Sequence, residues 1–114
     1  MASYTRGDIV WAKIEKTVSG GYKERPVLIL ASWPCNGTVD YMVCICSTSK
    51  ISDPYKMSFS DADLESGSLK SDECGFIRPS YLTSIIEADI THLAGRLCSA
   101  KLEEVMKTLR TILA

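Results

Sequence analysis

The sequence has few residues that could form a metal site or a disulfide framework. Its 114 residues include one histidine, His92, and five cysteines without a C-x-x-C pair. Zinc sites need several histidine or cysteine ligands at close spacing, so we expect no metal and no cofactor. Cysteines without paired spacing are typical of small buried residues in a reducing compartment, and we expect the protein to be cytoplasmic.

Long hydrophobic runs and a strong excess of one charge are also missing. The longest apolar runs span a few residues, whereas a membrane helix needs about 20. The first residues contain no apolar signal core, so we expect neither a membrane partner nor secretion. The formal net charge of −1 gives little indication of nucleic-acid binding. At this length we expect a single domain over residues 1–114.

Short apolar segments make up most of the chain. Residues 8–16, 27–33, 40–46, 55–59, 75–78 and 81–86 are rich in apolar and β-branched side chains, which predicts strands. Residues 17–24 predict a loop because Gly20 and Gly21 free the backbone. Residues 60–73 predict a loop with one helical turn, and Asp89 is a candidate cap for a brief helix that ends near Gly95.

The last segment has the clearest helical pattern. Ser99 is a suitable N-cap, and apolar residues recur after it at helical spacing: Leu102, Val105, Met106, Leu109, Ile112 and Leu113. Five or six short strands followed by one amphipathic helix predict a mainly β fold, a small curved barrel closed by the C-terminal helix.

The common catalytic motifs are absent. The sequence has no G-x-S-x-G, no P-loop, no metal-binding histidine pair and no evident cysteine–histidine dyad. An enzyme built from this chain must therefore use arginines, hydroxyls and carboxylates. RNA cleavage by the RNA's own 2′-hydroxyl suits this set. It requires positioning, positive charge on the phosphorane oxygens and proton transfers, but neither a metal nor a protein nucleophile.

Three strand ends carry side chains suited to that chemistry. Arg25 lies where a loop meets a strand, hydroxyl residues end the third strand, and Arg78 stands before Pro79, which favours an extended backbone at Arg78. Each has an ordinary structural explanation. A strand-end arginine can pair with an acid such as Asp72 or Glu73, and clustered hydroxyls often form turns. The joint occurrence at three strand ends favours an RNA-cleaving site.

Five blocks of the sequence resemble the MazF/PemK-type toxins of bacterial toxin–antitoxin pairs, in the family's order and over essentially the whole chain. They are Gly-Asp-Ile-Val-Trp at 7–11, Arg-Pro-Val-Leu-Ile-Leu at 25–30, Val-Cys-Ile-Cys-Ser-Thr at 43–48, Gly-Phe-Ile-Arg-Pro-Ser at 75–80 and Leu-Ala-Gly-Arg-Leu at 93–97. The resemblance implies an SH3-like barrel of the CcdB/MazF type. It also implies a homodimer, inhibition by a cognate antitoxin protein, and contact with operator DNA only through the antitoxin complex.

The resemblance further implies an activity and residue roles. The activity is metal-independent cleavage of single-stranded mRNA, which leaves 2′,3′-cyclic phosphate and 5′-hydroxyl ends. Arg25 and Arg78 would bind the scissile phosphate, and Ser47 and Thr48 would donate hydrogen bonds to its oxygens. The residues expected to bind RNA are Lys13, Lys23, Glu24, Ser49, Lys50 and Ser80.

Two departures from the family pattern leave the general base unnamed. The PemK branch has an aspartate two residues after its strand arginine, where this chain has Ser80. The loop before Arg-Pro usually has Gly-Ser/His-Glu-Gln, where this chain has Val-Ser-Gly-Gly-Tyr at 18–22. Glu24 is a substitute candidate for the base. A catalytically weak or silent homologue that acts by binding is therefore an alternative.

A reader domain is the second alternative. Residues 7–13 also resemble the opening of PWWP domains, which read methyl-lysine and DNA. Such a reader needs an aromatic cage around the methylammonium group. Trp11, Tyr22 and Trp33 are the candidates for that cage, but this alternative leaves the other four blocks unexplained.

Overall fold

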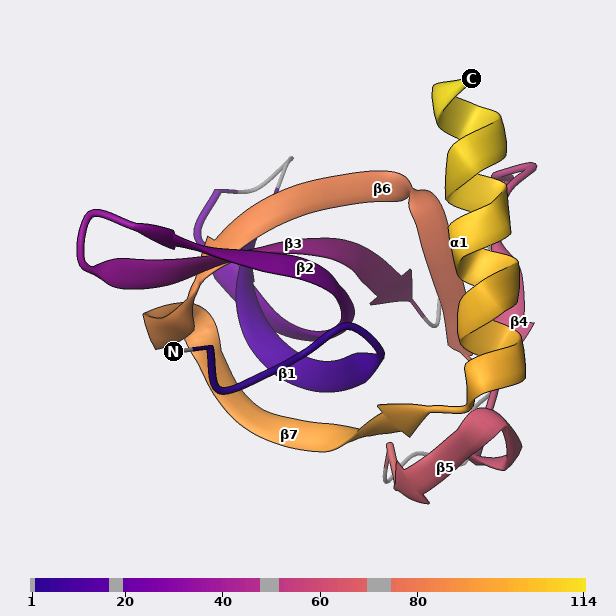
Figure 1. Ribbon diagram of the computed structural model, residues 1–114, viewed down its shortest axis with the longest axis horizontal. Coiled ribbons are helices and arrows are strands. Elements are labelled where there is room, and N and C mark those ends of the chain that lie inside the picture. Colours follow the sequence, from indigo (N-terminus) through magenta and orange to yellow (C-terminus); the bar gives the residue numbers. More distant parts are fainter. Residues whose placement is uncertain (1, 17–19, 48–51, 70–74) are drawn as a thin grey trace.

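One antiparallel sheet and one C-terminal helix make up the fold (Figure 1). The computed structural model describes residues 2–16, 20–47, 52–69 and 75–114. The elements in chain order are β1 (Asp8–Glu15), β2 (Tyr22–Cys35), β3 (Thr38–Ser47), β4 (Met57–Phe59), η1 (Asp61–Asp63), β5 (Leu64–Gly67), β6 (Gly75–Ile86), η2 (Glu87–Asp89), β7 (Ile90–Leu97) and α1 (Ser99–Leu113). The two η elements are short 3₁₀ helices, and the strand order is β4-β6-β3-β2-β1-β7-β5.

The sheet is strongly curved but not closed. Figure 1 shows β6 and β7 arching on opposite sides of β1, β2 and β3, with α1 along one side. Within the described ranges, the edge strands β4 and β5 do not pair with each other. The mainly β fold with a C-terminal helix is confirmed, but the predicted closed barrel is an open, curved sheet.

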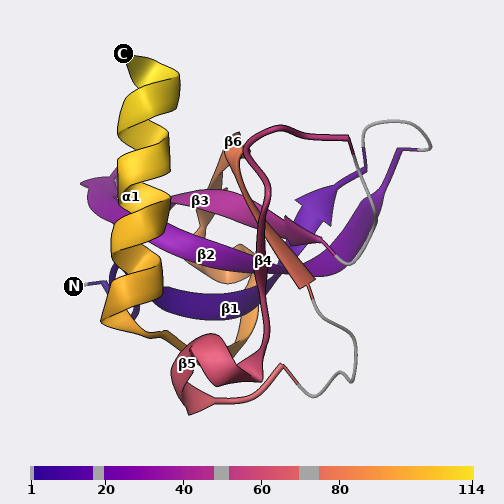
Figure 2. The same cartoon turned by 90° about the vertical axis from the view of Figure 1, so that its right-hand side faces the viewer.

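Two apolar clusters cover the two faces of the sheet. Alternate residues of a strand point to opposite faces, so β1, β2 and β3 contribute to both clusters. The cluster on one face contains Ile9, Leu28, Cys44, Ile77 and, from α1, Val105 and Leu109. The cluster on the other face contains Val10, Val27, Val43 and Ile45. Figure 2 shows α1 beside β2 and β3, as its part in the first cluster requires.

The β2–β3 connection is a two-residue turn that the sequence specifies. Asn36 and Gly37 both have positive φ, 51° and 81°, and the flanking Cys35 and Thr38 are paired. Positive φ at both central residues defines the type I′ turn, which favours Asn-Gly. The resulting hairpin projects away from α1 (Figure 1).

Strand β2 begins three residues earlier than the predicted loop allows. The pairing of β1 with β2 continues to Glu15 and Tyr22, and the turn before it contains Gly20 and Gly21 at φ values of 70° and 72°. Lys23 and Glu24 therefore lie on a strand rather than in a loop. Residues 17–19 lie outside the described ranges.

Residues 75–78 and 81–86, predicted as two strands, are one strand, β6. Ile45 pairs with Arg78 and its neighbour Cys44 pairs with Leu82, so the strand bulges between these two pairs. Pro79 lies in the bulge, where the missing N–H of a proline is tolerated.

The brief helix predicted between Asp89 and Gly95 is wrong. This segment is β7, because it pairs with β1 on one side and β5 on the other. Asp89 still caps a short element, since its carboxylate accepts from the backbone N–H of Ile86 at 3.2 Å in front of η2.

Three smaller boundaries also differ from the sequence prediction. Strand β4 starts at Met57, not at residue 55. The helical turn predicted within residues 60–73 is confirmed as η1, but the edge strand β5 that follows it was predicted as loop. Helix α1 is capped by Cys98 rather than Ser99, and Cys98 makes no side-chain capping bond.

Candidate active site

Arg25 and Ser47 lie across from each other at one end of the β2–β3 pair. Val27 pairs with Ile45, and each candidate lies two residues further toward the same end, so both belong to one face. Arg25 is half-buried and Ser47 is 6% exposed. Both line a pocket of about 200 Å³. The structure thus places an arginine and a hydroxyl together at the edge of one cavity.

The walls of this pocket combine charge with apolar surface. Besides Arg25 and Ser47, it is lined by Trp11, Lys23, Glu24, Pro26, Cys46, Phe59, Leu69 and Gly75. Lys23 and Glu24, two of the expected RNA-binding residues, therefore belong to the pocket. Lys13 does not line it, although this exposed residue pairs with Glu24 across β1 and β2.

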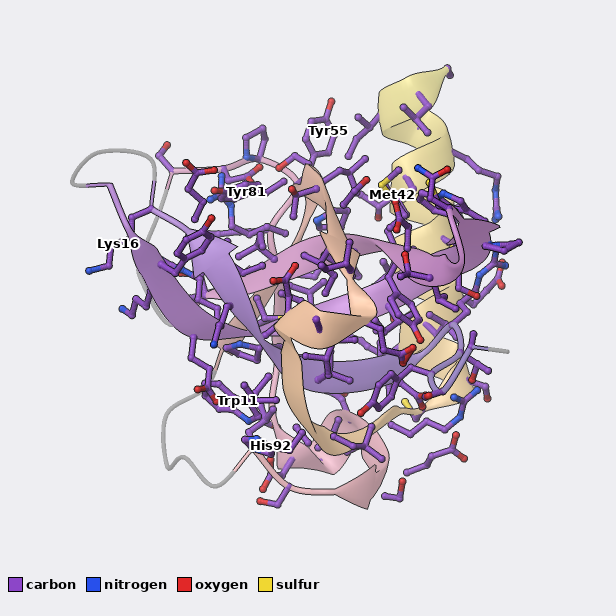
Figure 3. All side chains as sticks on the ribbon, turned by 90° about the vertical axis from the view of Figure 1, so that its left-hand side faces the viewer. Trp11, Lys16, Met42, Tyr55, Tyr81 and His92 are labelled. Atoms are coloured by element: carbon purple, nitrogen blue, oxygen red, sulfur yellow. The ribbon has the colours of Figure 1, made fainter. Side chains whose placement is uncertain are left out.

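Trp11 and His92 form an aromatic pair beside the same pocket. Their rings lie 6.1 Å apart at an angle of 19° (Figure 3). The Thr91 hydroxyl donates to Glu24 Oε1 at 3.0 Å, and His92 Nδ1 lies 3.9 Å from that oxygen. A neighbouring pocket of about 510 Å³ is lined by Trp11, Glu24 and His92, among others. No local sequence pattern predicts this aromatic pair, because it depends on the pairing of β1 with β7.

Arg78 lies in a separate group centred on Asp53. Its Nε donates to Asp53 Oδ2 at 2.9 Å, and the Ser80 hydroxyl donates to the same oxygen at 2.5 Å. The backbone N–H of Tyr55 donates to Oδ1 at 2.9 Å. The Arg78 guanidinium also lies over the Tyr81 ring, 5.1 Å from its centre. The acid beside Ser80 and Arg78 is thus supplied by the segment before β4.

The surroundings of Asp53 favour its charged form. The Ser80 hydrogen bond, together with those from Tyr55 and Arg78 and the charge of Arg78, lowers the pKa of Asp53 below its usual value, although burial opposes this. The Asp53 side chain is 5% exposed and that of Arg78 is 20% exposed. The pair is therefore an ionised, mostly buried salt bridge at neutral pH.

The two arginines share a face of the sheet but not a pocket. Arg78 pairs with Ile45, which pairs with Val27, so β3 separates Arg78 from the strand of Arg25. Two strand spacings, together with the two residues along β2 from Val27 to Arg25, separate the two arginine backbones by roughly 12 Å. Two long side chains can approach one phosphate across this distance. Arg78 and Ser80 do not line the pocket of Arg25 and Ser47.

Some residues that the sequence analysis named lie outside the part of the chain that the structure describes. Thr48, Ser49 and Lys50 lie outside the described ranges, as do Asp72 and Glu73. In the described ranges, no group of three or more His, Cys, Asp or Glu side chains is placed to hold a metal ion. No helix of the described chain is long and apolar enough to cross a membrane.

The aromatic cage of the reader alternative is not assembled. Trp33 lines a pocket near the β2–β3 hairpin with Pro34 and Val39, whereas Trp11 lines the pocket of Arg25. Tyr22 is on the same strand as Trp33 but eleven residues away, which corresponds to roughly 36 Å in an extended strand. The three rings therefore do not surround one ligand.

Known proteins with this fold include several toxins. The model of the PemK-like, MazF-like toxins of type II toxin–antitoxin systems matches residues 5–113. No curated protein matches the chain. Among solved structures, a MazE–MazF complex from Deinococcus radiodurans is similar at a TM-score of 0.69 and 17% identity, with 98% of this chain and 97% of that chain covered.

Two mycobacterial structures are similar in the same way. The Mycobacterium tuberculosis toxin MazF-mt6 has a TM-score of 0.68 at 16% identity, with 93% of this chain and 95% of that chain covered. An endoribonuclease in complex with its cognate antitoxin, from a mycobacterial species, has a TM-score of 0.65 at 15% identity, with 97% of this chain and 95% of that chain covered. At these identities the structures establish a common fold.

Proposed function

Because the chain belongs to the PemK-like, MazF-like toxins of type II toxin–antitoxin systems, we propose that it is a metal-independent endoribonuclease acting on single-stranded RNA in the cytoplasm. The observation that carries this proposal is the pocket at the end of β2 and β3. It combines Arg25, Ser47 and the exposed carboxylate of Glu24. These are the group types that 2′-hydroxyl attack requires.

The proposed reaction uses the substrate's own nucleophile. The 2′-oxygen attacks the adjacent phosphorus and loses its proton to a base, while the bond from phosphorus to the 5′-oxygen breaks. The 5′-oxygen takes up a proton, and the products are a 2′,3′-cyclic phosphate and a free 5′-hydroxyl. Arg25 and Arg78 stabilise the extra negative charge on the phosphorane, and Ser47 and Thr48 donate hydrogen bonds to its oxygens.

Glu24 is the candidate general base. A guanidinium stays protonated at any ordinary pH, so neither arginine suits this role. The Glu24 side chain is 45% exposed and lines the pocket beside Arg25. It is therefore accessible to a 2′-hydroxyl, unlike the buried carboxylate of Asp53.

The RNA would extend from this pocket over neighbouring side chains. Bases stack readily on exposed aromatic rings, and Trp11 and His92 provide such rings next to Glu24. The proposed contacts to the rest of the RNA come from Lys13, Lys23, Ser49, Lys50 and Ser80. We further propose a homodimer that is inhibited by a cognate antitoxin and that contacts operator DNA only through the antitoxin complex. A MazE–MazF complex in a structural neighbour supports the antitoxin part.

The proposal is tested by analysis of the product ends. Purified protein is incubated with a long, mixed-sequence single-stranded RNA in EDTA, and the fragments are examined by mass spectrometry. Cleavage should persist and yield cyclic phosphate and 5′-hydroxyl ends. Loss of cleavage on chelation, or 5′-phosphate ends, would overturn the mechanism. RNA binding without any cleavage would identify a silent homologue.

A further inference from the structure

Asp53 is a buried carboxylate with an unusually complete set of partners. It accepts hydrogen bonds from Arg78, from Ser80 and from the backbone N–H of Tyr55. Burial of a charge is costly unless the charge is paired and hydrogen-bonded. These three donors compensate that cost, so the carboxylate is held in one place and in turn holds the groups around it.

The way in which Asp53 binds Arg78 leaves part of the guanidinium available. A guanidinium has five N–H donors in one plane, and Asp53 accepts from Nε. The terminal nitrogens of Arg78 make no hydrogen bond to any other described residue. The Tyr81 ring lies against the guanidinium, with 5.1 Å between the ring centre and Cζ. Asp53 thus holds the Nε edge of the Arg78 guanidinium, and Tyr81 covers one of its faces. The N–H groups of the two terminal nitrogens remain for a ligand.

We propose that Asp53 is the positioning residue of Arg78, which it orients so that the terminal nitrogens meet the scissile phosphate. The proposal rests on the proposed function and adds a residue to it. Preorganised donors stabilise a transition state because they need no reorientation during the reaction. A guanidinium free to rotate would lose that advantage.

Asp53 is poorly suited to a direct role. Its side chain is 5% exposed, so a 2′-hydroxyl has little access to it. The hydrogen bonds from Ser80, Tyr55 and Arg78 hold the pKa of Asp53 below its usual range, which makes it a weak base. It therefore acts through Arg78.

Ser80 offers an alternative place for the same charge. Its hydroxyl oxygen lies 2.5 Å from the Asp53 carboxylate, so a carboxylate at position 80 would occupy nearly the same space. Ser80→Asp alone would place two carboxylates in contact, and we expect it to lower the rate. Ser80→Asp combined with Asp53→Ser moves the charge from one segment to the other and should restore the orientation of Arg78.

The test is a double-mutant cycle on kcat and KM for RNA cleavage. Asp53→Asn should lower kcat by roughly 10- to 100-fold, the scale of a small misplacement of a catalytic group, with KM nearly unchanged. In the Arg78→Ala background it should have no further effect on kcat. Asp8→Asn is the matched control, because Asp8 pairs with Arg96 at 2.9 Å in β1 and β7. It should leave kcat unchanged.

The exchange variant separates positioning from folding. Asp53→Ser should lose activity, and adding Ser80→Asp should recover most of it. If Asp53→Asn does not fold, the kcat of this exchange variant, which retains a carboxylate, is compared with that of the wild type instead. A kcat of Asp53→Asn within twofold of wild type, multiplicative effects in the double mutant, or no recovery in the exchange variant would each overturn the proposal.

A failure of the proposed function has a different signature. If the wild-type chain does not cleave RNA, the endoribonuclease proposal is contradicted, and the Nε–H NMR signal of Arg78 then tests the role of Asp53. A signal protected from exchange in the wild type and lost in Asp53→Asn supports a guanidinium held by Asp53. An unprotected wild-type signal contradicts it.

Discussion

Arg25 on β2 and Arg78 on β6 lie on the same face of the sheet, on either side of β3, yet their surroundings differ. Arg25 is half-buried at the edge of a pocket and forms no ion pair with another described residue. Arg78 is fixed by the buried carboxylate of Asp53 and by Tyr81. The two arginines therefore differ in how firmly the fold holds them. Arg25 is available to a ligand, whereas Arg78 is oriented by the fold and also contributes to its stability.

Removal of Arg25 should have the largest effect on cleavage and little effect on folding. Arg25→Ala is expected to raise the activation barrier by about 3–4 kcal/mol, the scale for one preorganised donor. The free energy of unfolding should change by no more than about 0.5 kcal/mol, as for most surface substitutions. Single-turnover cleavage and urea denaturation of the same preparation measure both quantities. A large loss of stability would show that Arg25 is structural.

Removal of Arg78 should affect both cleavage and stability. Arg78→Ala is expected to slow cleavage on a similar scale, but it also leaves the buried Asp53 carboxylate without its cation. An unpaired buried group costs about 1–3 kcal/mol of stability. The sequence alone predicts no such loss of stability, since no local pattern indicates the contact between Asp53 and Arg78. Denaturation of Arg78→Ala beside Arg25→Ala checks this contrast, and equal stability of the two variants would contradict it.

The Asp53 group should also make stability depend on pH. The pKa of Asp53 is lowered in the folded protein, so the unfolded chain takes up the proton first as the pH falls. The stabilisation is therefore complete above the ordinary aspartate pKa of about 3.9 and is lost as the pH falls through the lower, folded value. The stability difference between wild type and Asp53→Asn should shrink over this range in urea denaturation. A constant difference would mean that the charge of Asp53 contributes nothing.

The core and Arg25 could be predicted from the sequence, but the surroundings of Arg78 could not. The strands around Val27 and Ile45 are apolar on both faces, and the α1 pattern is periodic, so the core followed from local patterns. Arg25 could also be identified from the sequence, because it directly precedes the apolar strand segment at 27–33. The Asp53–Arg78 contact could not, because 25 residues separate the two and the Ser-Asp-Pro pattern at 52–54 indicates only a turn.

Strand pairing accounts for the other differences. The segment of His92 contains polar residues and a glycine, and its strand character comes from β1 on one side and β5 on the other. Local propensity does not report such neighbours. The Trp11–His92 pair and the start of β2 at Tyr22 were missed for this reason.

The proposed mechanism is tested most directly at the 2′-hydroxyl next to the cleaved bond. Once one cleavage position has been mapped, the ribose on its 5′ side is replaced by 2′-deoxyribose in an otherwise identical RNA oligonucleotide. Cleavage at this bond is expected to stop while binding of the oligonucleotide changes little, because only the nucleophile has been removed. Continued cleavage at the same bond would contradict attack by the RNA's own hydroxyl and the roles assigned to both arginines.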